Sequence, residues 1–453
     1  GIGPNWPFGQ SKRDKRQKTS VMIMTKMKKV FLALIGFSLL MIYLFVSSRR
    51  EVTITLGMFT GSNWDVYNAE SYKVIDDAIK KFEKEHPNVT IEYKSGILKQ
   101  DYSAWLASNI ASGEQPDVFM VLAEDFNKLS SLGALMPLDE LIKANNVSTD
   151  IFYESALSSG SYQNTQYALP YEINPTMMCV NRDLLEKEGI AIPEGNWTIE
   201  EFYQICAQVT KDTDGDGTID QYGSYGFKWQ DAVNGYGISL FDEEGASSNL
   251  NQSDVREALS YIQKLKDLNK SYQVSSEDFD KGNVAFCPLT FAQYRTYQPY
   301  PYRVSKYSTF KWSCLAMPGT TANQKTSQIA TSLIAITSKT TQQQLAFEFL
   351  ETLTIDQEIQ QELFENSQGA SALKSVMASD STKAVLDQDA MSNYSLKQDV
   401  LDDIIENAVI EPKFKKYNNI IERCDYLITN ALNENKIDDE LVDIEKEIDN
   451  LLK

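Results

Sequence analysis

One short loop carries acidic side chains at the spacing of a calcium-binding loop. In the segment DTDGDGTIDQYG, carboxylates recur at alternate positions, a glycine allows a tight turn, and a threonine offers its carbonyl. The oxygen donors would come from Asp212, Asp214, Asp216, Thr218 and Asp220. Hard oxygen ligands at this spacing wrap Ca²⁺ in EF-hand-type loops. The loop therefore predicts a structural Ca²⁺ site. Position 12 is Gly223, so a distant glutamate or water would complete the shell. The alternative is a solvated acidic turn.

The sequence offers few residues or motifs for other kinds of chemistry. Its single histidine, His86, ends a predicted helix before a turn, which argues against His-dependent triads and histidine-rich metal sites. Neither a P-loop nor a Rossmann glycine fingerprint occurs. The five cysteines have no metal-binding spacing and are odd in number, so we predict buried free thiols. Glycoside hydrolysis needs only two carboxylates, and the sequence singles out no pair.

Residues 1–50 differ from the rest of the chain in charge and hydropathy. They hold ten Lys and Arg side chains against one acid, and a 17-residue apolar run at 30–46 follows three lysines. This pattern is typical of a secretory signal or an uncleaved anchor, and its charge asymmetry predicts that the bulk of the chain lies outside the cell. Residues 1–25 are left out of the fold prediction. Beyond residue 50, 33 basic and 62 acidic side chains remain, and this net charge of −29 argues against nucleic acid as a partner.

Alternating strand and helix patterns predict an α/β fold. Strand patterns lie at 51–59, 89–93 and 116–122, and helical spacing lies between them at 72–82 and 102–111. A chain of 453 residues is too long for one ordinary core, which favours two lobes. The pattern beyond residue 374 is almost entirely that of amphipathic helices.

The segment YALPYEINPTMMCVNRDLLEKEGI, residues 167–190, is predicted to cross between the lobes. Pro170 and Pro175 keep the backbone extended and remove donors, and an apolar run of strand length follows. Asn181 then stands where a helix N-cap belongs. An ordinary loop before a βα unit is the alternative. The buried strand pattern at 329–337 is a second candidate crossing.

Several motifs in this order resemble those of the family 1 extracellular solute-binding proteins, the carbohydrate-capturing subunits of ABC importers. The resemblance covers roughly residues 51–450 and rests on FEKEHPNVTIEY, SGEQPDVFMV, LGALMPLDELI, the crossing segment, NWTIEEF, FDKGNVAFC, LAMPG, TSLIAITS and AFEFLETL. It implies a two-lobe α/β fold of the periplasmic-binding-protein type (type II), with a cleft between the lobes and a helix-rich C-terminal part. Lobe 1 would comprise 51–174 with 332–373, and lobe 2 would comprise 175–331 with 374–453. The lobes would close on the ligand by a hinge motion.

The resemblance also implies where a sugar would bind. Aromatic rings can stack on the C–H faces of sugars, while carboxylates and amides can hydrogen-bond their hydroxyls. Side chains of these kinds, at strand ends or near the crossings, are Asn63, Trp64, Glu124, Asp125, Tyr171, Glu172, Asn174, Trp229, Gln230, Phe291, Tyr294, Gln368 and Tyr417. For each aromatic residue the alternative is packing in the core or on the surface. For Glu124 and Asp125 it is a carboxylate at a helix N-terminus.

The function implied by the resemblance is an extracytoplasmic receptor that captures an oligosaccharide and delivers it to the permease subunits of an ABC transporter. It would act as a monomer, by reversible binding rather than catalysis. Two alternatives stay open: a glycoside hydrolase acting on polysaccharide, and a ligand sensor for a membrane signalling protein. The apolar run ends without the cysteine that members of this family from Gram-positive bacteria carry there, so a retained helix anchor is favoured over cleavage near Ser48 and secretion.

Overall fold

The computed structural model describes residue 3 and residues 11–47, 50–66, 72–297, 310–321, 324–389 and 396–453. The chain forms two compact units, one of residues 1–53 and 83–90, the other of residues 54–82 and 91–453. In the first unit, α1 (Ser11–Ser47) is one helix with exposed apolar side chains. Its segment Arg16–Ser47 is long and apolar enough to cross a membrane, a property that signal sequences share. The predicted cleavage point near Ser48 lies outside the described residues.

The strands of the described chain form one mixed sheet and a small hairpin. The sheet order is β2-β1-β3-β10-β6-β8-β7, and β9 also pairs with β6. The strands are β1 (Val52–Gly57), β2 (Val89–Tyr93), β3 (Val118–Val121), β6 (Ala168–Asn181), β7 (Tyr222–Ser224), β8 (Val284–Thr290), β9 (Trp312–Leu315) and β10 (Ile329–Ile336), with β4 (Ser161–Tyr162) and β5 (Thr165–Gln166) in the hairpin. The predicted alternation of strands and helices is therefore present.

Strand β6 belongs to both halves of the sheet. Its first part pairs antiparallel with β10 as far as Pro175, and its second part pairs with β8 from Thr176 onward and with β9. The two prolines of this strand favour an extended backbone, which explains how 14 residues continue through the change of partner. This change falls where the sequence predicts that the chain leaves the first lobe.

Two further segments lie near this point. One is the predicted second crossing, which enters β10. The other was not predicted: Ala408 bridges to Ser327, and the Val409 amide donates to the Ser327 carbonyl at 2.8 Å. Three chain segments therefore connect the halves of the sheet.

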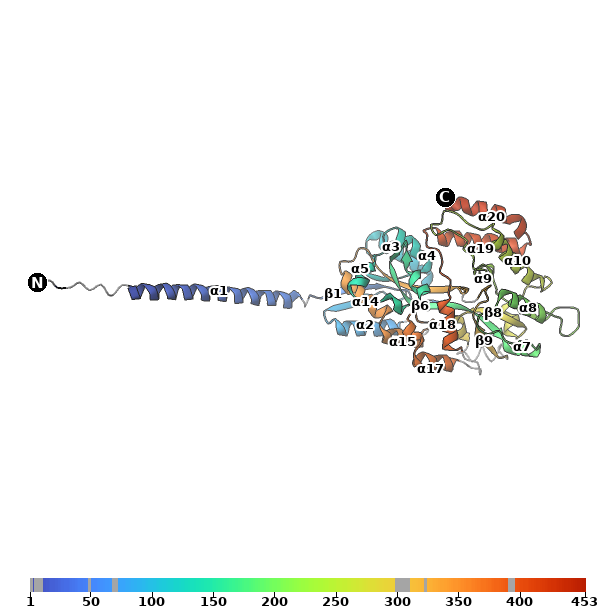
Figure 1. The fold of residues 1–453 in the computed structure, drawn as a ribbon, viewed down its shortest axis with the longest axis horizontal. Helices are drawn as coiled ribbons and strands as arrows, with labels where there is room; N and C mark the ends of the chain where they lie inside the picture. The colour runs from blue at the N-terminus through green and yellow to red at the C-terminus, as the bar shows by residue number, and fades with distance from the viewer. Residues whose placement is uncertain are drawn as a thin grey trace. The chain divides into compact units, whose positions relative to one another are not determined.

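Helices cover both halves of the sheet (Figure 1). Helices α4, α6 and α14 contact β10, whereas α7, α11 and α12 contact β8, and α8 contacts β7. In chain order the helices as far as β10 are α2 (Lys73–Glu85), α3 (Lys99–Ser112), α4 (Ala123–Ser131), α5 (Asp139–Ala144), η1 (Thr149–Ile151), α6 (Glu154–Ser159), α7 (Arg182–Lys187), α8 (Ile199–Val209), α9 (Trp229–Gly235), α10 (Ser253–Asp267), α11 (Ser276–Asp280) and α12 (Phe291–Tyr297). After β10 follow α14 (Gln343–Thr354) and α15 (Gln357–Asn366).

The C-terminal helices divide between the two halves. Helices α16 (Lys374–Met377) and α17 (Asp380–Asp389) contact α15, and α18 (Gln398–Glu406) contacts α6. The Tyr153 hydroxyl donates to Asp402 of α18 at 2.6 Å. Helices α19 (Tyr417–Asn433) and α20 (Ile437–Leu452) instead pack on each other, and α19 also contacts α10 (Figure 1). The contacts of α16 to α18 thus lie with elements of predicted lobe 1, although the sequence places residues 374–453 in lobe 2. The lobe limits stay a prediction.

Local signals in the sequence agree with the structure at two helix starts. Asn181 accepts a hydrogen bond from the Leu184 amide at 3.0 Å and caps α7. Thr198 and Glu201 form the predicted capping box at the start of α8. All five cysteines are free and buried, as predicted.

Candidate ligand-binding cleft

A cavity of about 750 Å³ lies where β6 changes partner, and we call it the cleft. One wall comes from the loop after β1, which contributes Asp65 and Val66. Thr176 and Gln328 contribute from two of the connecting segments. The opposite wall comes from the carboxyl ends of β7 and β8 and from α9, α11 and α12. Its residues are Tyr225, Gly226, Lys228, Gln230, Asp231, Ser276, Phe279, Asp280, Cys287, Pro288, Leu289, Thr290, Gln293 and Thr296. Its size suits a small ligand, and ligands of α/β proteins characteristically bind at the carboxyl ends of strands.

Asp231 is a buried carboxylate in the lining of the cleft. Its Oδ2 accepts a hydrogen bond from the Lys228 amide at 2.9 Å, at the start of α9. The residue is only 8% exposed. Burial raises the pKa of Asp231 to about 6, although the Lys228 amide and ammonium act in the opposite direction. A carboxyl group with this pKa can accept or donate a hydrogen bond near neutral pH, and a sugar hydroxyl can pair with either form.

A smaller cavity of about 260 Å³ adjoins the cleft, because Gln230 and Gln328 line both. Trp229 and Tyr417, two of the predicted sugar contacts, also line it. The Trp229 indole N–H and the Gln230 amide donate to the same Asp425 oxygen, at 2.8 and 2.7 Å. Asp425 therefore holds α9 against α19, and it orients both predicted ligand residues.

Both carboxylate oxygens of Glu172 accept hydrogen bonds from protein groups, and we call Glu172 and these neighbours the Glu172 cluster. One oxygen accepts from the Ser367 hydroxyl at 2.6 Å and from the Gly369 amide at 2.8 Å. The other accepts from Asn63 Nδ2 at 2.8 Å. Glu172 is 1% exposed, and its hydrogen-bond partners in this structure are protein groups. The cluster ties the loop after β1 to the turn after α15 and to β6.

Three polar atoms around this cluster are buried without a hydrogen-bond partner among the described residues. They are Asn63 Oδ1, Trp64 Nε1 and Gln368 Oε1. Trp64 lies close to the cluster, because a Cβ added at Gly369 would meet Trp64 Nε1 at 2.5 Å and Glu172 Oε1 at 2.4 Å. The structure thus brings together four predicted sites, and it leaves acceptors and a donor there that a ligand or water could satisfy.

Of the predicted sugar contacts, which all lie among the described residues, Gln230 alone lines the cleft. The Glu172 cluster lies outside that lining, and so do the remaining predicted contacts. Phe291 and Tyr294 are buried and stack at 6.1 Å, and Phe291 also stacks on Phe364. Tyr171 is buried, and burial raises its pKa above the usual range. Asn174 accepts from the Ala292 amide at 2.9 Å, so it caps α12. In this structure these side chains therefore pack in the core or cap a helix.

Glu124 and Asp125 lie in the first turn of α4. Asp125 accepts a hydrogen bond from the Ser103 hydroxyl. Glu124 is exposed, and its backbone carbonyl accepts from Asn418 at 3.1 Å. These positions agree with the alternative interpretation, in which a carboxylate at a helix N-terminus interacts favourably with the helix dipole.

The acidic loop has three carboxylates close together. Oxygen atoms of Asp212, Asp214 and Asp216 all lie within 4.8 Å of one another. Asp212 accepts from the amides of Gly215 and Gly217, each at 2.7 Å, which curls the loop around its carboxylate. The predicted ligand Asp220 instead accepts from the Thr213 amide and hydroxyl, at 2.9 and 2.7 Å. Thr218 donates its amide to Asp216 at 2.7 Å, and its carbonyl stays the predicted ligand.

Sequence reasoning missed most of the polar residues that line the cleft. Thr176 and Gln328 border the two predicted crossings, so their places beside those segments were available as a signal. Asp231 is two residues from Trp229, in the first turn of α9. Asp65 follows the predicted Asn63 and Trp64. These four residues each lie within or close to a predicted feature, but only the folded chain shows which side chains share the cavity.

The connected halves of the sheet and the ligand-sized cavity between them define a two-lobe binding-protein fold. The chain belongs to the bacterial extracellular solute-binding protein family, which it matches over residues 67–358. The predicted family and the predicted α/β fold with two lobes are therefore confirmed.

Solved structures of similar fold come from several bacteria. An ABC substrate-binding protein of Listeria monocytogenes in complex with cycloalternan has a TM-score of 0.66 at 20% identity, over 89% of this chain and 99% of that chain. The sugar-binding protein MalE of Xanthomonas citri has a TM-score of 0.72 at 15% identity, over 88% and 97%. The GacH receptor of Streptomyces glaucescens, solved unliganded and with acarbose, has a TM-score of 0.64 at 18% identity, over 89% and 98%.

A sequence relative described as a binding protein occurs in Brucella abortus. It is 28% identical over 134 residues, which are 29% of this chain. The match spans about a third, 31%, of that relative's own length. It adds to the family assignment and carries no information on the ligand.

Proposed function

We propose that this protein is an extracytoplasmic receptor that binds an oligosaccharide in the cleft and delivers it to the permease subunits of an ABC transporter. The observation that carries the proposal is the cleft itself, which offers carboxylates, amides, hydroxyls and the aromatic rings of Tyr225 and Phe279. One half of the sheet contributes the Asp65 carboxylate, and most of the other groups come from the other half. Such a mixture matches the hydroxyls and C–H faces of sugars. The similar structures of Listeria monocytogenes and Streptomyces glaucescens contain cycloalternan and acarbose, which supports a carbohydrate as the ligand class.

The proposed mechanism is reversible binding with closure of the halves, without catalysis. Asp231 and Gln328 would hydrogen-bond ligand hydroxyls, since both line the cleft. Trp229 would present its ring from the adjoining cavity. The three connecting segments would act as the hinge, because a few residues in extended segments can absorb the backbone rotation. Trp64 Nε1, which has no partner among the described residues, would bind ligand or water near the Glu172 cluster.

We further propose that α1 stays attached as a membrane anchor and that the receptor acts as a monomer. The apolar length of α1 supports retention at the membrane. A receptor anchored by one helix would remain near its permease. Detection of the α1 sequence in the mature protein by mass spectrometry would support the anchor, and a mature N-terminus beyond residue 47 would contradict it.

We also propose that the acidic loop binds a structural Ca²⁺. The convergence of Asp212, Asp214 and Asp216 supports it, since three carboxylates within 4.8 Å repel one another without a cation. In this structure Asp220 faces Thr213, so the ion would draw its remaining ligands from the Thr218 carbonyl, from water, or from Asp220 after a rotation of its side chain. Its role would be to stiffen the loop before β7.

The experiment that tests the receptor function is binding of the full chain, in detergent, to a panel of purified glycans by thermal shift and calorimetry. The informative variant is Gln328→Ala. The Gln328 side chain lines both cavities and has no hydrogen bond to another described residue. We expect stabilisation by at least one oligosaccharide, about tenfold weaker binding by Gln328→Ala, and an unchanged melting temperature without ligand. Gln204→Ala, at a residue of α8 remote from the cleft lining, is the matched control and should bind like the parent.

Two results would overturn the proposal. Failure of every carbohydrate to stabilise the protein would remove the ligand class. Release of shorter products from a glycan, detected by mass spectrometry and lost when Asp231 is replaced by Asn, would show a hydrolase instead.

A further inference from the structure

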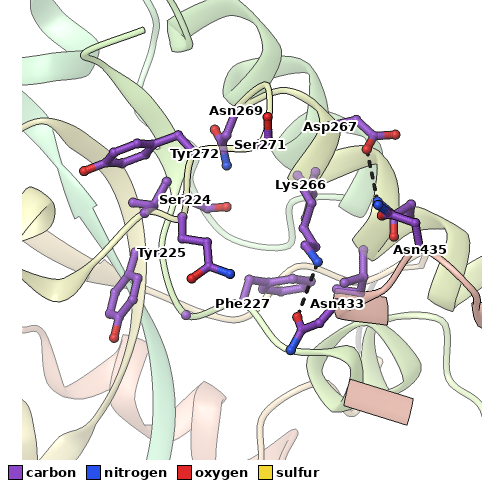
Figure 2. A pocket seen from close by; sticks show the side chains of 16 residues that line it. Ser224, Tyr225, Phe227, Lys266, Asp267, Asn269, Ser271, Tyr272, Asn433 and Asn435 are labelled. Atoms are coloured by element: carbon purple, nitrogen blue, oxygen red, sulfur yellow. Dashed lines mark hydrogen bonds between the residues drawn. The ribbon is translucent and has the colours of Figure 1, made fainter. Parts of the chain in front are cut away.

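A cavity of about 450 Å³ lies beside the cleft, on the flank of β7, and we call it the flank cavity. Its walls come from the loop after β7, the end of α10 with the turn that follows it, and the end of α19 (Figure 2). Tyr225 and Gly226 line both the flank cavity and the cleft. The two cavities therefore adjoin across these two residues.

At Gly226 little protein separates the two cavities. This residue has no side chain, and its φ of +79° is one that other residues rarely adopt. A Cβ added there would meet only Pro288, at 3.9 Å. The position next to Tyr225 is therefore open, and an elongated ligand could pass over the backbone from one cavity to the other.

Some of the amide groups that line the flank cavity have hydrogen-bonding atoms without a partner among the described residues. The side chains of Asn269 and Gln273 line it and make no hydrogen bond to another residue in the part of the chain that the structure describes. Gln263 Oε1 is buried there and also has no partner among the described residues. Free amides of this kind can donate to and accept from hydroxyl groups at once.

An aromatic ring stands in the same cavity in a fixed position. Tyr272 stacks on Tyr222 with centroids 4.8 Å apart and an interplanar angle of 8°. Its hydroxyl donates to Asp278 at 3.1 Å, which fixes the ring further, and yet the residue is 46% exposed. A ring that is held and exposed loses little entropy when a sugar face packs on it.

The charges of the flank cavity favour a neutral ligand. Lys266 reaches across it above Phe227, and its ammonium donates to the Leu432 carbonyl at 3.1 Å and to Asn433 at 3.4 Å (Figure 2). The neighbouring Asp267 carries the opposite charge and accepts from Gln263 at 3.0 Å. The ammonium is thus already bonded and its charge is balanced nearby, so an anion would gain little.

We propose that the flank cavity binds the sugar units of a neutral oligosaccharide that extends beyond the cleft over Tyr225 and Gly226. This proposal rests on the proposed receptor function. It adds the class of substrate, namely oligosaccharides longer than the cleft alone can hold. The free amides of Asn269 and Gln273 bind the hydroxyls of these units, and Tyr272 packs on a sugar face. Affinity should therefore continue to rise with chain length after the cleft is filled.

The test compares the full chain with the double variant Asn269→Ala, Gln273→Ala, in detergent, by calorimetry. The probes are two homologous series, maltose to maltoheptaose and mannobiose to mannohexaose. Neither replaced side chain has a hydrogen bond to lose, so the variant should keep the melting temperature of the parent. We expect equal affinity for the shortest chain that binds, and about tenfold weaker binding of the longest chain by the variant.

The shortest chain is the internal control, and Gln204→Ala on α8 is the control for amide removal at a distance. Equal affinities of parent and variant for every chain length would overturn the extension and leave the receptor function standing. An equal loss for the shortest and the longest chain would also overturn it, because the amides would then act on the cleft. If no chain of either series binds while another carbohydrate does, an extended gluco- or manno-oligosaccharide is excluded and the proposal fails. If no carbohydrate binds at all, the receptor function fails with it.

Discussion

Glu172 offers a sharp test of what the polar cluster around its carboxylate does. Its carboxylate accepts three hydrogen bonds, from Asn63, Ser367 and Gly369, and it is 1% exposed. Glu172→Ala would leave the Ser367 hydroxyl and the Gly369 amide buried without an acceptor. Each unsatisfied buried donor costs about 1–3 kcal/mol, and loss of side-chain packing adds to it. We therefore expect the free energy of unfolding to fall by about 3–5 kcal/mol.

Glu172→Gln is the matched variant, because it keeps the volume and one acceptor oxygen. That oxygen can still accept from Ser367 and Gly369. The new amide group would face Asn63, whose Oδ1 has no partner among the described residues and can turn to accept from it. We expect a loss of about 1 kcal/mol or less, so the two variants should differ by several kcal/mol.

The measurement is urea denaturation of both variants and the parent, followed by two spectroscopic probes to check that unfolding is two-state. The same preparations are then tested for carbohydrate binding. The sequence alone predicts the opposite for Glu172→Ala, namely weaker ligand binding with little loss of stability. If Glu172→Ala has the denaturation midpoint of the parent and has lost binding, Glu172 is a ligand contact and the structural reasoning is wrong.

Three further predictions concern other parts of the protein. The pKa of Asp231 is about 6 in the folded protein, whereas its ordinary value is 3.8, so the unfolded chain loses this proton at lower pH. The free energy of unfolding should therefore fall by about 3 kcal/mol as pH rises from about 4 to about 6. Urea denaturation at several pH values should show this slope, and Asp231→Asn should flatten it; an unchanged slope would contradict the assignment. Gly369→Ala should cost about 1–3 kcal/mol, since its Cβ would lie 2.4 Å from Glu172, and a melting temperature equal to the parent's would show that the cluster can yield. EGTA should lower the melting temperature at matched ionic strength, whereas Asp214→Asn should respond less; a melting curve that EGTA leaves unaltered would sink the Ca²⁺ proposal.

The sequence by itself determined the local features of this protein. The prolines of β6 and the apolar run after them predicted a strand that crosses from one half of the sheet to the other, and β6 is that strand. The caps at Asn181 and Thr198 were predicted and are present. These features depend on residues close together in the chain, where periodicity and backbone restriction act directly.

Only the tertiary structure decided which polar groups meet. Glu172 and Ser367 are 195 residues apart in the chain, and nothing in the local pattern shows that one carboxylate would bind both Ser367 and Asn63. The third connecting segment at Ala408 and the division of the C-terminal helices also depend on contacts between distant elements. Composition and spacing predict which residues could bind a sugar. Whether a side chain faces a cavity or another side chain depends on long-range packing, which short-range sequence patterns do not specify.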